Sequence, residues 1–215
     1  ITVDDGGENQ IVISPGANGA LSPGDVDRRG ADIAVAAAVI AQLEVPLEAI
    51  ARAFELGRLA GVLTVLNAAP LTWPDVLEPL LALTDLTVCN LGEARSLVSG
   101  DECEPGRLAA RMTQRTGGQA LVTAGKRGAW LQPGPGLELL HQPAFQPSSV
   151  IDSTGAGDAF IGAFLCRWGE TRDRREALRF GAAAGALACE TLGAVASLAS
   201  RATIEHRLNG WMQAQ

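Results

Sequence analysis

The residues in this sequence with the clearest chemical potential form a short glycine-rich stretch followed by an acid. Gly155, Ala156 and Gly157 come after an apolar run, and Asp158 opens an apolar helix that we expect to reach about Trp168. Because these three residues carry no side chain larger than a methyl group, their backbone N–H groups can converge on a small anion. The helix dipole also favours negative charge at that end. The stretch therefore predicts an anion-binding loop.

Asp158 suggests that the loop does more than bind an anion. A carboxylate would repel a phosphate that is only held there, but it can accept a proton from a hydroxyl group as a phosphoryl group arrives. The alternative is an ordinary glycine turn in which Asp158 stabilises the first turn of the helix. These residues alone leave both interpretations open.

The elements around this loop must bring further side chains to it. Apolar runs of strand length alternate with helical patterns, which predicts a mostly parallel sheet with helices on both faces. A turn over 125–128 and a proline- and glycine-rich loop over 133–136 predict an antiparallel end to the sheet. The expected strands cover 10–14, 36–43, 62–66, 86–89, 120–123, 129–132 and 137–141, and the main helices 46–59, 73–83, 92–98, 104–115, 174–191 and 203–212.

Polar residues follow the apolar runs, where the carboxyl ends of strands are expected. They are Glu44, Asn67, Asn90, Thr123 and Asp152. In open parallel sheets, ligands bind beyond this edge. Any one of these residues can simply begin a loop, but five together favour a binding site.

Composition excludes several classes of function. The chain has 215 residues with a net charge of −7 and no basic run, so nucleic acid is not an expected partner. Its longest apolar stretches, around 34–41 and 180–189, are shorter than the ~20 residues of a membrane span. Four scattered cysteines without a C-x-x-C pair predict buried thiols in a reducing, cytoplasmic compartment. P-loop and G-x-S-x-G motifs are not found.

Taken in order, a series of motifs resembles the ribokinase-like (PfkB) sugar kinases over nearly the whole chain. The Asp152–Asp158 segment resembles the most specific signature of the family, and 42–48 resembles its ribokinase branch. The other segments are 7–9, 16–18, 21–23, 66–70, 90–94 and 123–128. The resemblance implies one α/β domain over 1–215, a three-layer α/β/α sandwich, with 1–13 as the remnant of a β lid.

The implied activity is transfer of the γ-phosphoryl group of ATP to the 5-hydroxyl of D-ribose, with Mg²⁺ and K⁺ as further cofactors. Asp158 would be the base, the amides of 155–157 the anion hole, and Glu44 a contact to the sugar. Two alternatives stay open. In the first, the acceptor is fructose, a keto-deoxy sugar acid or a nucleoside. In the second, the chain is a non-catalytic fragment that binds nucleotide.

The resemblance also implies a nucleotide site. Asn90 and Glu93 would hold the Mg²⁺–phosphate end of ATP, mostly through water. Ala182 stands where family members often carry a histidine beside the adenine. For Gly125 and Gly128 a plain hairpin turn is an alternative that is compatible with nucleotide binding. The implied lining is Thr123, Ala124, Gly125, Lys126, Arg127, Gly128, Gly157 and Ala182.

A monovalent-cation site is the last implied feature. Asp152 and Thr154 would provide ligands, together with oxygen atoms at Ala188, Thr191, Gly193 and Ser197. Oxygen-rich loops suit a hard cation such as K⁺, which would fix the shape of the neighbouring anion hole. The alternative is a helix C-terminus followed by an ordinary turn at Gly193.

The sequence opens at Ile1 in the middle of a strand–turn pattern. The first sugar-binding segment of the family and much of its lid have no counterpart here. We therefore expect the beginning of the natural protein to lie upstream of Ile1, and little or no kinase activity from this chain alone. Members of the ribokinase branch commonly pair through their lids, so a homodimer is an expectation from the resemblance only.

Overall fold

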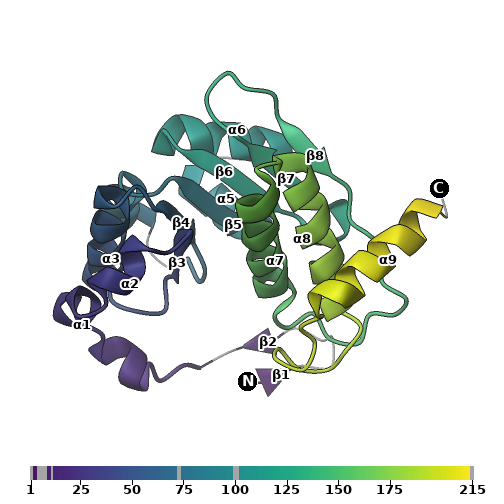
Figure 1. Cartoon of the computed structure of the whole chain (residues 1–215), viewed down its shortest axis with the longest axis horizontal. Helices are drawn as coiled ribbons and strands as arrows, with labels where there is room; N and C mark the ends of the chain where they lie inside the picture. The colour runs from purple at the N-terminus through teal and green to yellow at the C-terminus, as the bar shows by residue number, and fades with distance from the viewer. Residues whose placement is uncertain (1, 4–8, 11, 72–73, 99–101, 214–215) are drawn as a thin grey trace.

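A six-stranded sheet forms the centre of the computed structural model, which describes residues 2–3, 9–10, 12–71, 74–98 and 102–213 (Figure 1). Its strands lie in the order in which they occur along the chain. The first four are parallel and the last two are antiparallel. They are β3 (Ala38–Gln42), β4 (Leu63–Asn67), β5 (Leu86–Asn90), β6 (Gln119–Thr123), β7 (Ala129–Gln132) and β8 (Leu140–Gln142).

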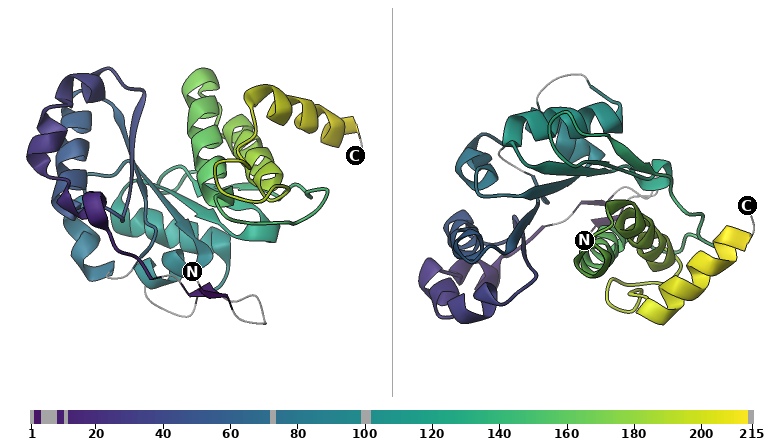
Figure 2. Two further views of the ribbon diagram at one scale, coloured as in Figure 1. Left: turned by 90° about the horizontal axis from the view of Figure 1, so that it is seen from below. Right: turned by 45° about the horizontal axis from the view of Figure 1, so that its top comes forward.

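Helices cover both faces of this sheet, as Figure 2 shows. On one face lie α3 (Leu47–Leu59), α4 (Glu78–Leu81), α5 (Leu91–Val98) and α6 (Pro105–Thr116). On the other lie α7 (Ala156–Thr171) and α8 (Arg174–Ala188). The remaining described elements are the helix α9 (Arg201–Gln213) and the shorter β1 (Thr2–Val3), β2 (Asn9–Gln10), η1 (Gly16–Ala20), α1 (Pro23–Asp27), α2 (Gly30–Ala34), η2 (Pro74–Leu77) and η3 (Gly125–Arg127). The predicted three-layer sandwich is confirmed.

Two apolar cores follow from the alternation of side chains along the strands. Leu66 and Cys89 point toward α3–α6, whereas Val65 and Val88 on the same strands point toward α7 and α8. All four are buried. Strands that are apolar on both faces are expected where helices cover both sides of a parallel sheet.

Two glycines allow α7 and α8 to pack closely. A Cβ atom on Gly181 would lie 2.9 Å from the carbonyl oxygen of Phe160, and one on Gly185 would lie 3.1 Å from that of Ala156. The second contact holds the beginning of α7 directly against α8. It therefore fixes the glycine-rich loop relative to the rest of the domain.

The C-terminal helix α9 is tied to α7 by ion pairs. Arg201 donates hydrogen bonds to both carboxylate oxygens of Glu170, and Arg167 donates to it from within α7. These bonds, chiefly those from Arg201, lower the pKa of Glu170. The contribution to stability is therefore fully present above the pKa of an unfolded glutamate and is lost as the pH falls through the lowered folded-state value.

We expect Glu170→Gln to destabilise the protein at pH 7 and to have a smaller effect at pH 3, because pH 3 lies below the pKa of an unfolded glutamate and the contribution of the charge is there already partly lost. Urea unfolding of both proteins at the two pH values measures this. An equal loss at pH 7 and pH 3 would show that charge at Glu170 does not contribute.

Some predicted boundaries differ from the structure for identifiable reasons. The helix expected over 73–83 is a 3-10 turn and a short α4, because Pro79 is accommodated only at a helix start; Trp73 lies outside the described residues. Of the strand expected over 10–14, Gln10 lies in β2, Ile11 lies outside the described residues, and Val12 and Ile13 lie in a loop, 88% and 61% exposed. The helix expected over 174–191 ends at Ala188, and the one expected from Asp158 begins two residues earlier.

Candidate active site

The glycine-rich loop leads directly into α7. Gly155 caps the helix with a φ of 77°, and Asp158 lies in the first helical turn with an exposed side chain. A Cβ on Gly155 would meet Ala194 at 3.2 Å, a tight contact with the loop after α8, and the left-handed φ also favours glycine here. The amide of Ala156 donates to the carbonyl of Ser153 at 3.1 Å. An anion in this loop would compete with that bond for the Ala156 amide.

Asp158 has a partner that the sequence analysis did not single out. The side-chain amide of Gln42, at the end of β3, donates to Oδ1 of Asp158 at 2.9 Å. Gln42 also lines a cavity of about 320 Å³ that includes Glu44, the predicted sugar contact. The end of β3 and the beginning of α7 therefore meet, although 116 residues separate them in sequence.

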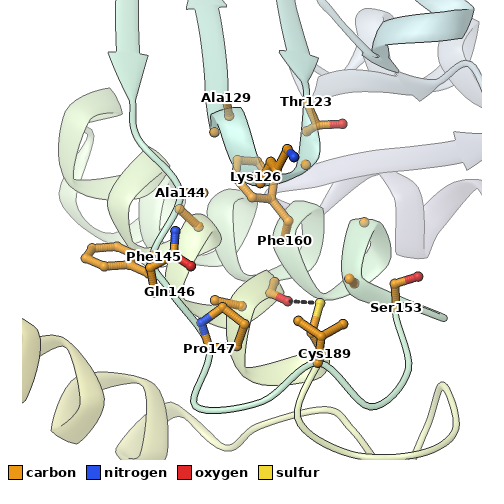
Figure 3. A pocket seen from close by; sticks show the side chains of 18 residues that line it. Thr123, Lys126, Ala129, Ala144, Phe145, Gln146, Pro147, Ser153, Phe160 and Cys189 are labelled. Atoms are coloured by element: carbon orange, nitrogen blue, oxygen red, sulfur yellow. Dashed lines mark hydrogen bonds between the residues drawn. The ribbon is translucent and has the colours of Figure 1, made fainter.

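A larger cavity, of about 520 Å³, lies between the β6–β7 turn, the beginning of α7 and α8 (Figure 3). Its walls are mainly apolar and contain Cys189, whose thiol donates to the carbonyl of Gly185 at 3.4 Å. Predicted site residues in the lining are Thr123, Gly125, Lys126, Gly128, Ala156, Gly157 and Ala182. Among the residues that line it, those without a predicted role include Phe160, Gly185, Cys189 and the segment 144–147.

Asn90 and Glu93 do not belong to this lining. They form a capping box at α5 instead: the Glu93 amide donates to Oδ1 of Asn90 at 2.9 Å, and the Asn90 amide donates to Oε2 of Glu93 at 2.7 Å. Partial burial raises the pKa of Glu93. The register places Asn90 opposite Thr123, so the pair lies at the same sheet edge as the cavity.

The loop that contains Asp152 is hydrogen-bonded to the loop that follows α8. Oδ1 of Asp152 accepts from the amide of Thr154 at 2.9 Å, and Oδ2 accepts from that of Gly193 at 2.8 Å. Hydrogen bonds from Thr154 and from Gly193 lower the pKa of Asp152. The hydroxyl of Ser197 donates to the carbonyl of Ala194.

The remaining predicted cation ligands are less clearly grouped with Asp152. Ala188 is the last residue of α8 and is fully buried, and Thr191 is exposed. The interloop bonds from Ile151 and Asp152 go to the carbonyl of Cys189 instead. One expectation was wrong: Asp152 does not end a sheet strand, because 150–152 is a loop in which Val150 is 72% exposed.

Within the described part of the chain, no three or more histidine, cysteine, aspartate or glutamate residues cluster as a metal site. None of the helices described there is long and apolar enough to span a membrane. The candidate site consists of the loop before α7, the two cavities beside it and the paired loops at Asp152.

The family of the chain follows from its similarity to known proteins. Residues 1–201 match the pfkB family of carbohydrate kinases. The chain belongs to this family. The match over 1–201 confirms the predicted family membership. The matched range includes the loop before α7, the capped α5 and the β6–β7 turn.

Curated relatives of this PfkB-family chain include several sugar kinases. Ribokinase of Staphylococcus aureus is 37% identical over 203 residues, which are 92% of this chain and 65% of that protein. Deoxyribokinase of Salmonella typhi is 34% identical, over 83% of this chain and 58% of that protein. A bifunctional ribokinase/ribose-5-phosphate isomerase A of Fructilactobacillus sanfranciscensis is 35% identical, over 97% of this chain and 38% of that protein. The chain spans less than two thirds of the length of each.

Solved structures agree with the fold. Ribokinase from Giardia lamblia superposes with a TM-score of 0.85 at 28% identity, covering 95% of this chain and 70% of that one. Arabidopsis thaliana ribokinase complexed with ribose and ATP gives a TM-score of 0.82 at 28% identity, covering 94% of this chain and 65% of that one. The sandwich and its sheet edge are therefore those of ribokinase-like enzymes.

Proposed function

We propose that this chain carries the nucleotide and phosphoryl-transfer site of an ATP-dependent sugar kinase whose acceptor is the 5-hydroxyl of D-ribose. The observation that carries the proposal is the position of Asp158. It lies at the beginning of α7, where Ala156 and Gly157 line the larger cavity, and it bonds Gln42, which lines the smaller one with Glu44. A base between a nucleotide cavity and a sugar cavity is the arrangement that direct phosphoryl transfer requires.

In this mechanism Asp158 accepts the proton of the sugar hydroxyl while the hydroxyl oxygen forms a bond to the γ-phosphorus. The bond from that phosphorus to the β-bridging oxygen breaks, and ADP leaves. Backbone amides before α7 balance charge on the phosphoryl oxygens. The glycines at 125 and 128 bring backbone close to the nucleotide, and Lys126 adds positive charge beside them.

We assign supporting roles to two further groups. Glu93 has one oxygen in the capping box, and its second oxygen can hold a water of a hydrated Mg²⁺ on the nucleotide phosphates. The carbonyl and carboxylate oxygens of the paired loops at Asp152 have the chemistry that K⁺ prefers. Bound there, K⁺ would hold the loop before α7 in shape, since Gly155 packs directly on Ala194.

The test is ADP formation by the 215-residue chain with MgATP and D-ribose, with and without K⁺, beside a panel of 2-deoxy-D-ribose, fructose, a keto-deoxy sugar acid and a nucleoside. Ribose-dependent turnover raised by K⁺ supports the full proposal. The deoxyribokinase relatives make 2-deoxy-D-ribose the second candidate acceptor, favoured if its kcat/KM exceeds that of ribose. Nucleotide binding with silence for every sugar would favour the non-catalytic alternative.

Gln42 gives a specific expectation within this function. Replacing it by leucine removes the only described side-chain bond to Asp158, so the carboxylate is no longer held toward the acceptor. We expect Gln42→Leu to lower kcat about tenfold, since misplacement of a reacting group by a fraction of an ångström is costly. The KM for MgATP should stay within about twofold, because the nucleotide cavity does not include Gln42. Steady-state kinetics measure both; a change in KM alone would contradict the assignment.

A further inference from the structure

The C-terminal helix α9 packs behind one wall of the larger cavity. This wall is the segment 144–147, which has no regular secondary structure. The ring of Phe145 points away from the other side chains that line the cavity, as Figure 3 shows. It stacks on Trp211 of α9 with ring centroids 4.4 Å apart and planes 8° apart. The outer side of the wall therefore rests on α9.

A polar network makes a second connection between α9 and the cavity. Arg207 donates two hydrogen bonds to the carboxylate of Glu190, at 2.8 and 2.9 Å. The same carboxylate accepts from the amide of Ser148 at 2.6 Å, and Arg207 also donates to the Ser148 hydroxyl at 3.2 Å. Glu190 follows Cys189, which lines the cavity. One arginine thus joins the wall segment to the end of α8.

The two connections support each other. The guanidinium of Arg207 lies 5.4 Å from the ring centroid of Trp211, so it keeps the indole in place while it bonds Glu190. The side chains of Arg207 and Glu190 are only 30% and 16% exposed. A pair that is partly shielded from water and makes several hydrogen bonds is more rigid than an ordinary surface ion pair.

We propose that α9 is a positioning element of the nucleotide site: Trp211 and Arg207 hold the wall 144–147 and the following Ser148 in their binding conformation, although α9 contributes no residue to the cavity lining described here. This rests on the proposed function, in which the cavity holds ATP. If this irregular segment became ordered only when nucleotide binds, the loss of conformational entropy would weaken binding. Because α9 already holds the segment in the unliganded protein, this loss does not occur on binding.

The experiment measures MgATP affinity by calorimetry and amide hydrogen exchange of 144–148 in the unliganded protein. For Trp211→Ala we expect affinity to fall about tenfold and exchange at 144–148 to rise, because the aromatic stack is lost. Trp211→Phe keeps a ring on Phe145 and should recover most of the affinity. Each protein is first checked for an unchanged far-ultraviolet spectrum.

A matched pair of arginine variants separates wall positioning from general loss of α9 packing. Arg207→Gln and Arg201→Gln each break an arginine–glutamate pair of α9, but only the Arg207 pair reaches Ser148. We expect weaker MgATP binding for Arg207→Gln and unchanged binding for Arg201→Gln.

Intact nucleotide binding in Trp211→Ala and Arg207→Gln, or equal losses in both arginine variants, would overturn the inference while leaving the proposed function standing. If the unaltered chain bound no MgATP, the proposed function would fail and this inference with it.

Discussion

Asp158→Asn is expected to reduce sugar phosphorylation by about 10²–10⁴-fold, the range typical for loss of a positioned general base. Asparagine keeps the size of the side chain but cannot accept the hydroxyl proton. MgATP affinity should change by no more than a few-fold, because Asp158 is not part of the larger cavity. Steady-state ADP formation and calorimetric MgATP binding measure the two quantities.

The control for this variant is Glu48→Gln, which removes the first-turn carboxylate of α3. Both substitutions remove one negative charge near a helix N-terminus, so both lose a similar stabilisation of about 0.3–1 kcal/mol. Only Asp158→Asn should lose turnover. An Asp158→Asn protein with the rate of Glu48→Gln would mean that Asp158 only stabilises α7, which is the alternative that the sequence left open.

The sheet and its helices could be predicted because their signals are local. Buried strands such as β4 and β5 are short apolar runs, and α3 has apolar residues at helical spacing between charged ones. The antiparallel pairing of β7 and β8 followed from the loop over 133–136. In each case the information lies in the residues of the element itself or in the loop next to it.

Most of the candidate site that could be predicted lies in contiguous motifs. The loop over 155–157 and the turn over 125–128 were found in this way; Ala182 is an exception that came from the family resemblance. Gln42 and the wall 144–147 were not assigned roles, because their positions depend on partners far along the chain. Gln42 meets Asp158 across 116 residues, and Phe145 meets a tryptophan of the last helix. The mutual capping of Asn90 and Glu93, by contrast, was a readable local signal, since N-x-x-E has the spacing of a capping box.

At position 128, backbone conformation and close packing require glycine, whether or not the residue also contacts a ligand. From the sequence, this glycine is predicted either to form a hairpin turn or to contact the nucleotide, and the two roles are compatible. In the structure its φ is +98°, and a Cβ atom would lie 2.1 Å from the carbonyl oxygen of Gln142 and 2.9 Å from the amide nitrogen of Ala144. These are backbone atoms of the segment that continues into the cavity wall, so they can yield only if that segment moves.

Gly128→Ala is therefore expected to lower the free energy of unfolding by about 3 kcal/mol or more, from left-handed strain and overpacking together. Gly136→Ala is the matched control: its φ is +72°, but no atom lies within 4 Å of the added Cβ, so only the conformational cost of about 1–2 kcal/mol applies. Urea unfolding measures both losses, and MgATP calorimetry should show weaker binding for Gly128→Ala alone. Equal destabilisation by the two variants would show that the segment after β8 can shift freely. In that case its contact with Gly128 would not help to shape the cavity.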